Sequence, residues 1–109
     1  MSFVSIMQAD ELMPGEKAIA EVNERKILLV NLDGKFFALD NRCPHLGGSL
    51  GDGMMEKGRI VCPRHHAIFD LKTGECLGNA RIAFISMKVK NAKSIPVKVE
   101  QGNILVDLD

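Results

Sequence analysis

The stretch RCPHLGGSLGDGMMEKGRIVCPRHHAIFDLKTG, residues 42–74, contains every histidine of the chain and two of its three cysteines. The candidate metal ligands in it are Cys43, His45, Cys62 and His65. They form two short groups, each with one thiolate and one imidazole, and a proline follows each cysteine. Because proline fixes φ and has no amide N–H, it stiffens a loop that must present ligands. The stretch therefore predicts one metal centre held by two loops.

Zinc and iron–sulfur centres both use two cysteines and two histidines. The usual tetrahedral zinc sites pair cysteine with cysteine and histidine with histidine at close spacing. Here the ligand types alternate within each loop, and the Cys-x-His spacing of Cys43 and His45 is short for a single zinc ion. In a binuclear [2Fe–2S] centre the two cysteines can hold one iron and the two histidines the other. The spacing favours iron–sulfur and leaves zinc open.

Other residues of the stretch are expected to play supporting parts. Glycines at 47, 48, 51 and 53 permit the unusual backbone dihedrals of a tight loop close to a cofactor. The C-x-x-H spacing selects His65 over His66, so we expect His66 to lie at the rim of the site. Cys76 falls outside both groups, and we interpret it as a buried structural thiol.

The rest of the chain has the alternating pattern of short β-strands. We expect strands at 3–7, 16–22, 26–32, 35–40 and 67–71, and a closing hairpin within 95–108. Asp33-Gly34 is a strong hairpin signal, because both positions tolerate positive φ. Short strands with turns at close intervals predict an all-β fold, an antiparallel sandwich or barrel. No long amphipathic helix is expected, and the long basic stretch 78–94 is left unassigned.

Length, charge and cysteine content narrow the class of protein. A chain of 109 residues fits a single domain, 1–109. Its 14 basic and 14 acidic residues balance, which excludes bulk attraction to nucleic acid. No signal peptide or membrane-spanning apolar run is visible, so we expect a cytoplasmic protein. An odd number of cysteines interleaved with histidines favours metal binding over disulfides.

The motif CPHLGGSL…CPRHHAIFDLKTGEC resembles the Rieske iron–sulfur signature, C-x-H-L-G followed by C-P-x-H-x-x-x-F-D. The lead-in LVNLDGKFFALDNRCPH and the ending IPVKVEQGNILVDL also resemble strands of that family. The resemblance implies one [2Fe–2S] cluster per chain, with Cys43 and Cys62 on the buried iron and His45 and His65 on the exposed iron. It also implies a Rieske-type antiparallel β-sandwich or barrel with a small cluster-binding subdomain at about 41–73.

Two departures from the high-potential members of that family point to a low potential. Those members carry an extra disulfide-forming cysteine in each loop, where this chain has Gly48 and Arg64. They also carry a serine and a tyrosine that donate hydrogen bonds to the cluster and cysteine sulfurs, where this chain has Ala67 and Phe69. Missing donors destabilise the electron-rich reduced state. We therefore expect a potential near the low end of the Rieske range, roughly −150 mV.

The resemblance implies a soluble electron carrier rather than an enzyme. After His45 and His65 are used, only His66 remains, so the two-histidine iron site of an oxygenase cannot form within the chain. No GxGxxG or P-loop pattern is present. We expect a ferredoxin, monomeric in isolation, that takes electrons from a flavin-dependent reductase and gives them to a terminal oxygenase or reductase. The alternatives are the small subunit of a nitrite reductase and a zinc-stabilised binding module.

Overall fold

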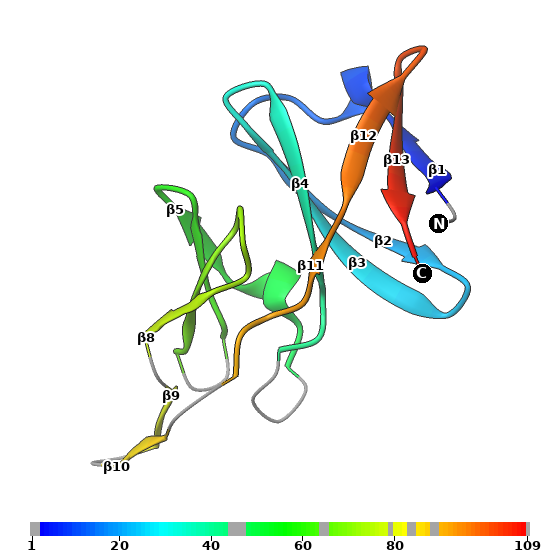
Figure 1. The fold of residues 1–109 in the computed structure, drawn as a ribbon. Helices are drawn as coiled ribbons and strands as arrows, with labels where there is room; N and C mark the ends of the chain where they lie inside the picture. Colours follow the sequence, from blue (N-terminus) through cyan, green and yellow to red (C-terminus); the bar gives the residue numbers. More distant parts are fainter. Residues whose placement is uncertain are drawn as a thin grey trace.

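The computed structural model describes residues 3–43, 48–63, 66–78 and 90–108, and the backbone of 80–82 and 85–87. These residues form short strands and two 3₁₀ helices (Figure 1). In chain order the elements are β1 (Phe3–Gln8), η1 (Ala9–Glu11), β2 (Lys17–Val22), β3 (Arg25–Leu32), β4 (Lys35–Asp40), η2 (Leu50–Asp52), β5 (Met54–Glu56), β6 (Arg59–Val61), β7 (Ile68–Asp70), β8 (Cys76–Gly78), β9 (Ala80–Ile82), β10 (Ile85–Met87), β11 (Ser94–Ile95), β12 (Val97–Glu100) and β13 (Asn103–Asp107).

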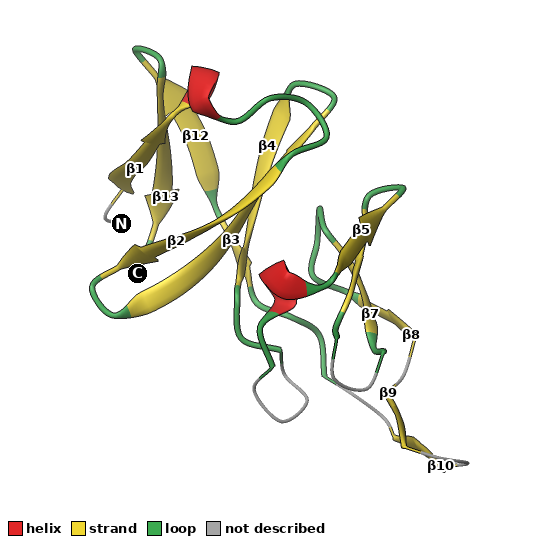
Figure 2. Cartoon of the chain, turned by 180° about the vertical axis from the view of Figure 1, so that it is seen from behind, coloured by secondary structure: helices red, strands yellow, loops and turns green. Residues whose placement is uncertain are grey.

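The sheets are stacked in three layers. The middle layer is the sheet β11-β4-β3-β2; the sheet β1-β13-β12 covers one face, and the sheet β5-β6-β7-β8 lies against the other (Figures 1 and 2). Every pairing between these strands is antiparallel. The predicted all-β, antiparallel fold is confirmed.

Strand β3 belongs to both hydrophobic cores, because its side chains alternate between the two faces of the middle sheet. Ile27 and Leu29 pack in the base core, which the middle sheet shares with β1 and β13. Leu28 and Val30 pack in a second core, which it shares with β6 and β7. All four side chains are at most 1% exposed. Full burial of one such side chain stabilises the fold by about 1.5–3 kcal/mol. Because β3 contributes two of them to each core, its side chains stabilise both cores.

Two-residue turns with positive φ set the register of the hairpins. Asp33 and Gly34, with φ of 54° and 92°, join β3 to β4 as the sequence predicts. Gln101 and Gly102, with φ of 50° and 77°, join β12 to β13 within the expected closing hairpin. Both residues of a type I′ turn need positive φ, and its twist matches that of the strands.

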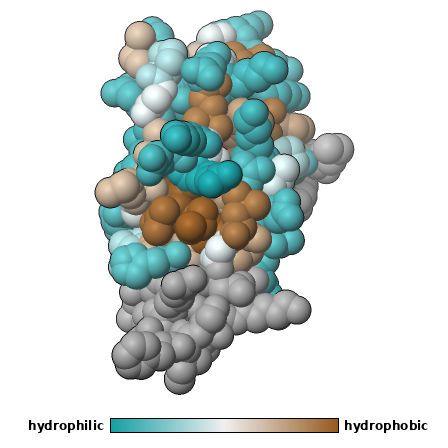
Figure 3. Space-filling view, turned by 90° about the vertical axis from the view of Figure 1, so that its left-hand side faces the viewer, coloured by the Kyte–Doolittle hydropathy of each residue, from teal (hydrophilic) through white to brown (hydrophobic). Residues whose placement is uncertain are grey.

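The sheet β5-β6-β7-β8 contains a hairpin that the sequence interpretation missed. The sequence predicts no strand between 40 and 67, yet β5 and β6 pair within that segment around the turn Lys57-Gly58. The outer face of this sheet carries an apolar patch: Met54 and Leu77 are 68% and 47% exposed, beside half-buried Val61 and Ile68. Figure 3 faces this side of the molecule and shows the apolar surface.

The stretch left unassigned at 78–94 contains two short strands. Strands β9 and β10 pair antiparallel and extend away from the body of the molecule (Figure 1). Beyond them the chain returns to the body of the molecule: Ala92 is buried in the second core and its N–H donates to the Gly74 carbonyl (2.7 Å), while the carbonyl of exposed Lys93 accepts from the Asp40 N–H (2.8 Å). Among the described residues, no helix is long and apolar enough to cross a membrane.

Candidate metal centre

The first ligand loop begins directly after β4 and closes on itself. Arg42 and Ser49 form an isolated antiparallel bridge across its base. One step further in, the Cys43 N–H donates to the Gly48 carbonyl at 2.7 Å. The two ends of the first loop therefore lie side by side, and Cys43 is the first residue inside the bridge that closes it.

The second ligand loop joins β6 to β7 and is closed in the same way. The Cys62 N–H donates to the Ala67 carbonyl at 2.8 Å, and the His66 N–H donates to the Cys62 carbonyl at 3.1 Å. The pairs 43–48 and 62–67 have the same separation along the chain. The two loops thus present their cysteines from equivalent positions, as a centre with two matching pairs of ligands requires.

Both cysteines are buried in a single core. Cys43 and Cys62 are each 1% exposed, and the core around them includes Leu50, Ile60 and Phe69. Neither forms a disulfide. A thiolate in apolar surroundings is costly unless a partner neutralises its charge, and a bound metal provides that neutralisation. Two buried cysteines on matching loops, neither of them in a disulfide, fit the thiolate side of a [2Fe–2S] centre.

The histidine half of the predicted site lies outside the described residues, which omit His45 and His65. The assignment of all four ligands therefore stays a prediction. The neighbouring His66 is exposed and has a φ of 63°, which places it at the outer side of the second loop.

Two glycines have a different role from the one predicted. Gly51 and Gly53 are absent from the positive-φ positions, and Gly53 has a φ of −81°. A Cβ on Gly53 would collide with the carbonyl oxygen of Val61, and one on Gly51 would collide with the Ile19 side chain. Gly53 is thus required by close packing rather than by its dihedral angles. The contact between Gly53 and the Val61 carbonyl thus packs the segment that follows the first loop against the strand that precedes the second loop.

Sequence reasoning also missed a polar cluster at the base of the first loop. The buried Asn41 side chain bonds to Ser49 and Gly51, and Lys17 Nζ donates to the Gly51 carbonyl at 2.6 Å. The signal available in the sequence was Asn41 itself, a polar residue that directly follows strand β4. Its partners could not be identified, because they meet only when the loop is folded.

The residues at the two hydroxyl positions of high-potential relatives are apolar and buried. Ala67 and Phe69 are 1% and 0% exposed and lie in the core that holds both cysteines. Cys76 is half-buried beside this core, and its thiol lies 3.4 Å from the Gly78 carbonyl. Cys76 is therefore less buried than predicted, although it packs against the core as a structural thiol would.

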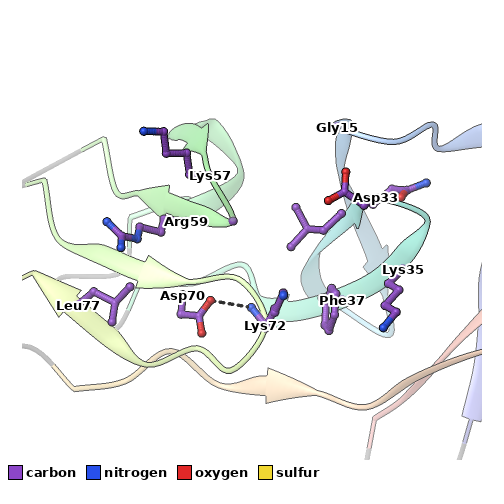
Figure 4. Close-up of a pocket in the computed structure, with 12 residues that line it drawn as sticks. Gly15, Asp33, Lys35, Phe37, Lys57, Arg59, Asp70, Lys72 and Leu77 are labelled. Atoms are coloured by element: carbon purple, nitrogen blue, oxygen red, sulfur yellow. Dashed lines mark hydrogen bonds between the residues drawn. The ribbon is translucent and has the colours of Figure 1, made fainter.

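A groove of about 770 Å³ opens elsewhere, between the turn of the β5–β6 hairpin and the β3–β4 hairpin. Lys57 and Arg59 come from one wall and Lys35 from the other (Figure 4). Cys62 follows the opposite end of the β5–β6 hairpin. The groove is therefore separate from the metal centre.

Comparison with known proteins identifies this arrangement. The family model of the Rieske [2Fe-2S] domain matches residues 2–101. The ferredoxin component of the alkene monooxygenase system of Xanthobacter autotrophicus is 32% identical over 107 residues, 97% of this chain and 81% of that protein. The ferredoxin component of the naphthalene 1,2-dioxygenase/salicylate 5-hydroxylase systems of a Ralstonia species is 30% identical over 100 residues, 92% of this chain and 89% of that one.

Solved structures give the same result. The ferredoxin of carbazole 1,9a-dioxygenase from Nocardioides aromaticivorans IC177 has a TM-score of 0.80 and 25% identity, and the match covers 97% of each chain. The chain belongs to the Rieske [2Fe–2S] domain family. It carries a [2Fe–2S] cluster and is an electron carrier rather than a catalytic enzyme. The comparisons favour the ferredoxin interpretation over a nitrite reductase subunit or a zinc module.

Proposed function

We propose that this protein is a monomeric cytoplasmic ferredoxin that passes single electrons from a flavin-dependent reductase to a terminal oxygenase. Its relatives support this, since they are named as ferredoxin components of monooxygenase and dioxygenase systems. The single structural observation that carries the proposal is the pair of matching loops, each closed at its cysteine and joined in one buried core.

We further propose that Cys43 and Cys62 hold the inner iron, while His45 and His65 hold the outer one. The burial of both cysteines supports the first pair, and the position of each histidine two or three residues further along its loop supports the second. The cluster-binding part spans about residues 41–73 of a single domain, 1–109. Within it, each loop carries one ligand of each kind.

The chain's own residues fix the base of each ligand loop and exclude water from the cysteine side of the site. When bound, the cluster supplies the capacity to accept and release one electron. The Cys43 and Cys62 N–H bonds fix the base of each loop, so the ligands need little rearrangement when the charge changes. The core around the thiolates excludes water from the inner side. His66, next to the proposed ligand His65, is exposed, which supports access of a partner from this side.

Replacing the proposed ligands tests the assignment. Cys43→Ser and Cys62→Ser should prevent cluster assembly, because each removes one of the two thiolates on the inner iron. His45→Ala and His65→Ala should abolish the Rieske visible and EPR spectra. Cys76→Ser is the matched control and should keep both spectra. A normal spectrum in Cys43→Ser, or a lost one in folded Cys76→Ser, would contradict the ligand set.

Capture of partners tests the electron path. Affinity-tagged holoprotein is incubated with lysate of its native host, and bound proteins are assayed for bound flavin and for oxidation of the reduced cluster. A captured flavoprotein should reduce the cluster with NADH or NADPH, and a captured oxygenase should reoxidise it. If the only redox partner recovered is a nitrite reductase large subunit, the proposed path is wrong.

A further inference from the structure

Asn41 is a buried polar residue between β4 and the first ligand loop. It is 3% exposed, and both ends of its side-chain amide are used. Nδ2 donates to Ser49 Oγ at 2.9 Å, and Oδ1 accepts from the Gly51 N–H at 2.7 Å. The Asn41 side chain, which precedes the first ligand loop, thus binds Ser49 and Gly51, which follow it.

The backbone of Asn41 adds to the same connection. Its N–H donates to the Lys26 carbonyl at 3.0 Å, which anchors it to β3, and its carbonyl accepts from the Leu50 N–H at 2.8 Å. Cys43 lies two residues further on, with its own N–H bonded to the Gly48 carbonyl. The orientation of Cys43 therefore depends on a short path that starts at Asn41.

The surroundings of Asn41 leave little room for a substitute. An added Cβ on Gly51 would lie 2.9 Å from Asn41 Oδ1 and would collide with the Ile19 side chain. Lys17 Nζ binds the Gly51 carbonyl from the other side. Without the Asn41 amide, the buried Gly51 N–H would lose its partner, and an unsatisfied buried donor is costly. The loop base would have to move to satisfy it.

We propose that Asn41 is a positioning residue of the cluster, which fixes the base of the first ligand loop and through it the orientation of Cys43. This rests on the proposed ligand role of Cys43. Groups outside the ligand set orient the ligands and tune the metal centre they hold. Loss of Asn41 should therefore change the spectrum of the cluster and how firmly it is held, as well as the stability of the fold.

The chain offers a matched control in Asn31. This residue is also 3% exposed, and its amide also makes two hydrogen bonds, here both to backbone groups: Nδ2 donates to the Leu12 carbonyl and Oδ1 accepts from the Gly34 N–H, both at 2.8 Å. It pairs with Phe36 near the start of β4, whereas Asn41 follows the end of that strand. The two asparagines differ mainly in their distance from the ligand loops.

Holoprotein of Asn41→Ala and Asn31→Ala is compared in three measurements: thermal unfolding, EPR of the reduced cluster, and the rate of cluster loss to an iron chelator. Both variants should unfold at a lower temperature. Only Asn41→Ala should shift the EPR g-values, and it should lose its cluster about tenfold faster, in line with other residues that orient metal ligands. Equal g-values and equal loss rates in the two variants would overturn the proposal.

Ser49→Ala keeps the test valid if Asn41→Ala does not fold. It removes only the Nδ2 bond and leaves the bond to Gly51 in place. Faster cluster loss than in the wild type would support the proposal, and a wild-type rate would overturn it. Cys43→Ser in the same series separates the two hypotheses: a normal cluster there would refute the ligand assignment, whereas normal behaviour of Asn41→Ala or Ser49→Ala alone refutes only the positioning role.

Discussion

Ala67 is paired with Cys62 at the base of the second loop and shares its core. Its carbonyl accepts the Cys62 N–H at 2.8 Å, and its methyl group is buried in the same core as that cysteine. No hydroxyl is available at this position to donate a hydrogen bond toward the cluster. A donor would favour the reduced state, which carries more negative charge. We therefore expect Ala67 to contribute to a low reduction potential.

The variant Ala67→Ser tests this at the scale of one hydroxyl group. We expect its reduction potential to rise, by up to about 59 mV if the hydroxyl favours the reduced state by about 1.4 kcal/mol in a one-electron couple. Protein-film voltammetry measures the change. Ala38→Ser is the control, because Ala38 is 2% exposed but lies in the base core. An unchanged potential in Ala67→Ser, or an equal rise in both variants, would contradict the role.

The sequence revealed individual residues where their chemistry is local. Cys43 and Cys62 stand out by residue type and spacing, and the turn at Asp33 by its neighbouring glycine. Asn41 was missed because its partners are later in the chain and reach it only through the folded loop. The role of Gly53 was misassigned, because nothing in the sequence shows that the Val61 carbonyl lies against it.

At the scale of elements, predictability followed strand length. Strands β3 and β4 are long enough to show alternation, and their predicted bounds differ from the observed ones by at most one residue. Strands β5 and β6 span only three residues each, too few for a clear pattern. The turn between them, Lys57-Gly58, has φ of 50° and 75°. Its glycine was the local sequence signal that could have indicated a hairpin.

The contact between η2 and β6 gives a prediction for these short elements. In Gly53→Ala the new Cβ would overlap the Val61 carbonyl, and the backbone before Cys62 would have to move. Overpacking of this kind costs about 1–3 kcal/mol. A cost of about 2 kcal/mol lowers the melting temperature of a domain of this size by roughly 10 °C. The EPR spectrum should shift as well, because the displaced segment leads into Cys62, a proposed ligand.

Gly58→Ala is the control for that experiment. Gly58 has a φ of 75°, and a Cβ there would meet no atom within 4 Å. Its substitution strains the left-handed backbone by about 1–2 kcal/mol but displaces nothing near the cysteines. Its EPR spectrum should match the wild type. A wild-type spectrum in Gly53→Ala would show that the two loops are not coupled through this contact.

At the scale of the whole molecule, two cores share one sheet, and only one of them contains the cysteines proposed as ligands. The base core is built from β1, β3, β4 and β13 and includes neither ligand cysteine. The second core contains both Cys43 and Cys62. Because a metal centre rarely exists in an unfolded chain, its binding energy stabilises the part of the fold that holds it. Cluster binding should therefore stabilise the two cores unequally.

Hydrogen exchange of the holoprotein and of protein stripped of its cluster tests this division. Removal of the cluster leaves two buried thiols without their metal, so the loops and the β5-β6-β7-β8 sheet should open at low free energy. Peptides covering 41–53 and 60–71 should lose protection, including the Cys43 and Cys62 amides. Peptides covering 3–8 and 103–107 should keep it, because β1 and β13 pair with each other above the base core. Uniform loss of protection along the chain would show instead that the protein unfolds as one unit and that β3 transmits the loss of the cluster to both cores.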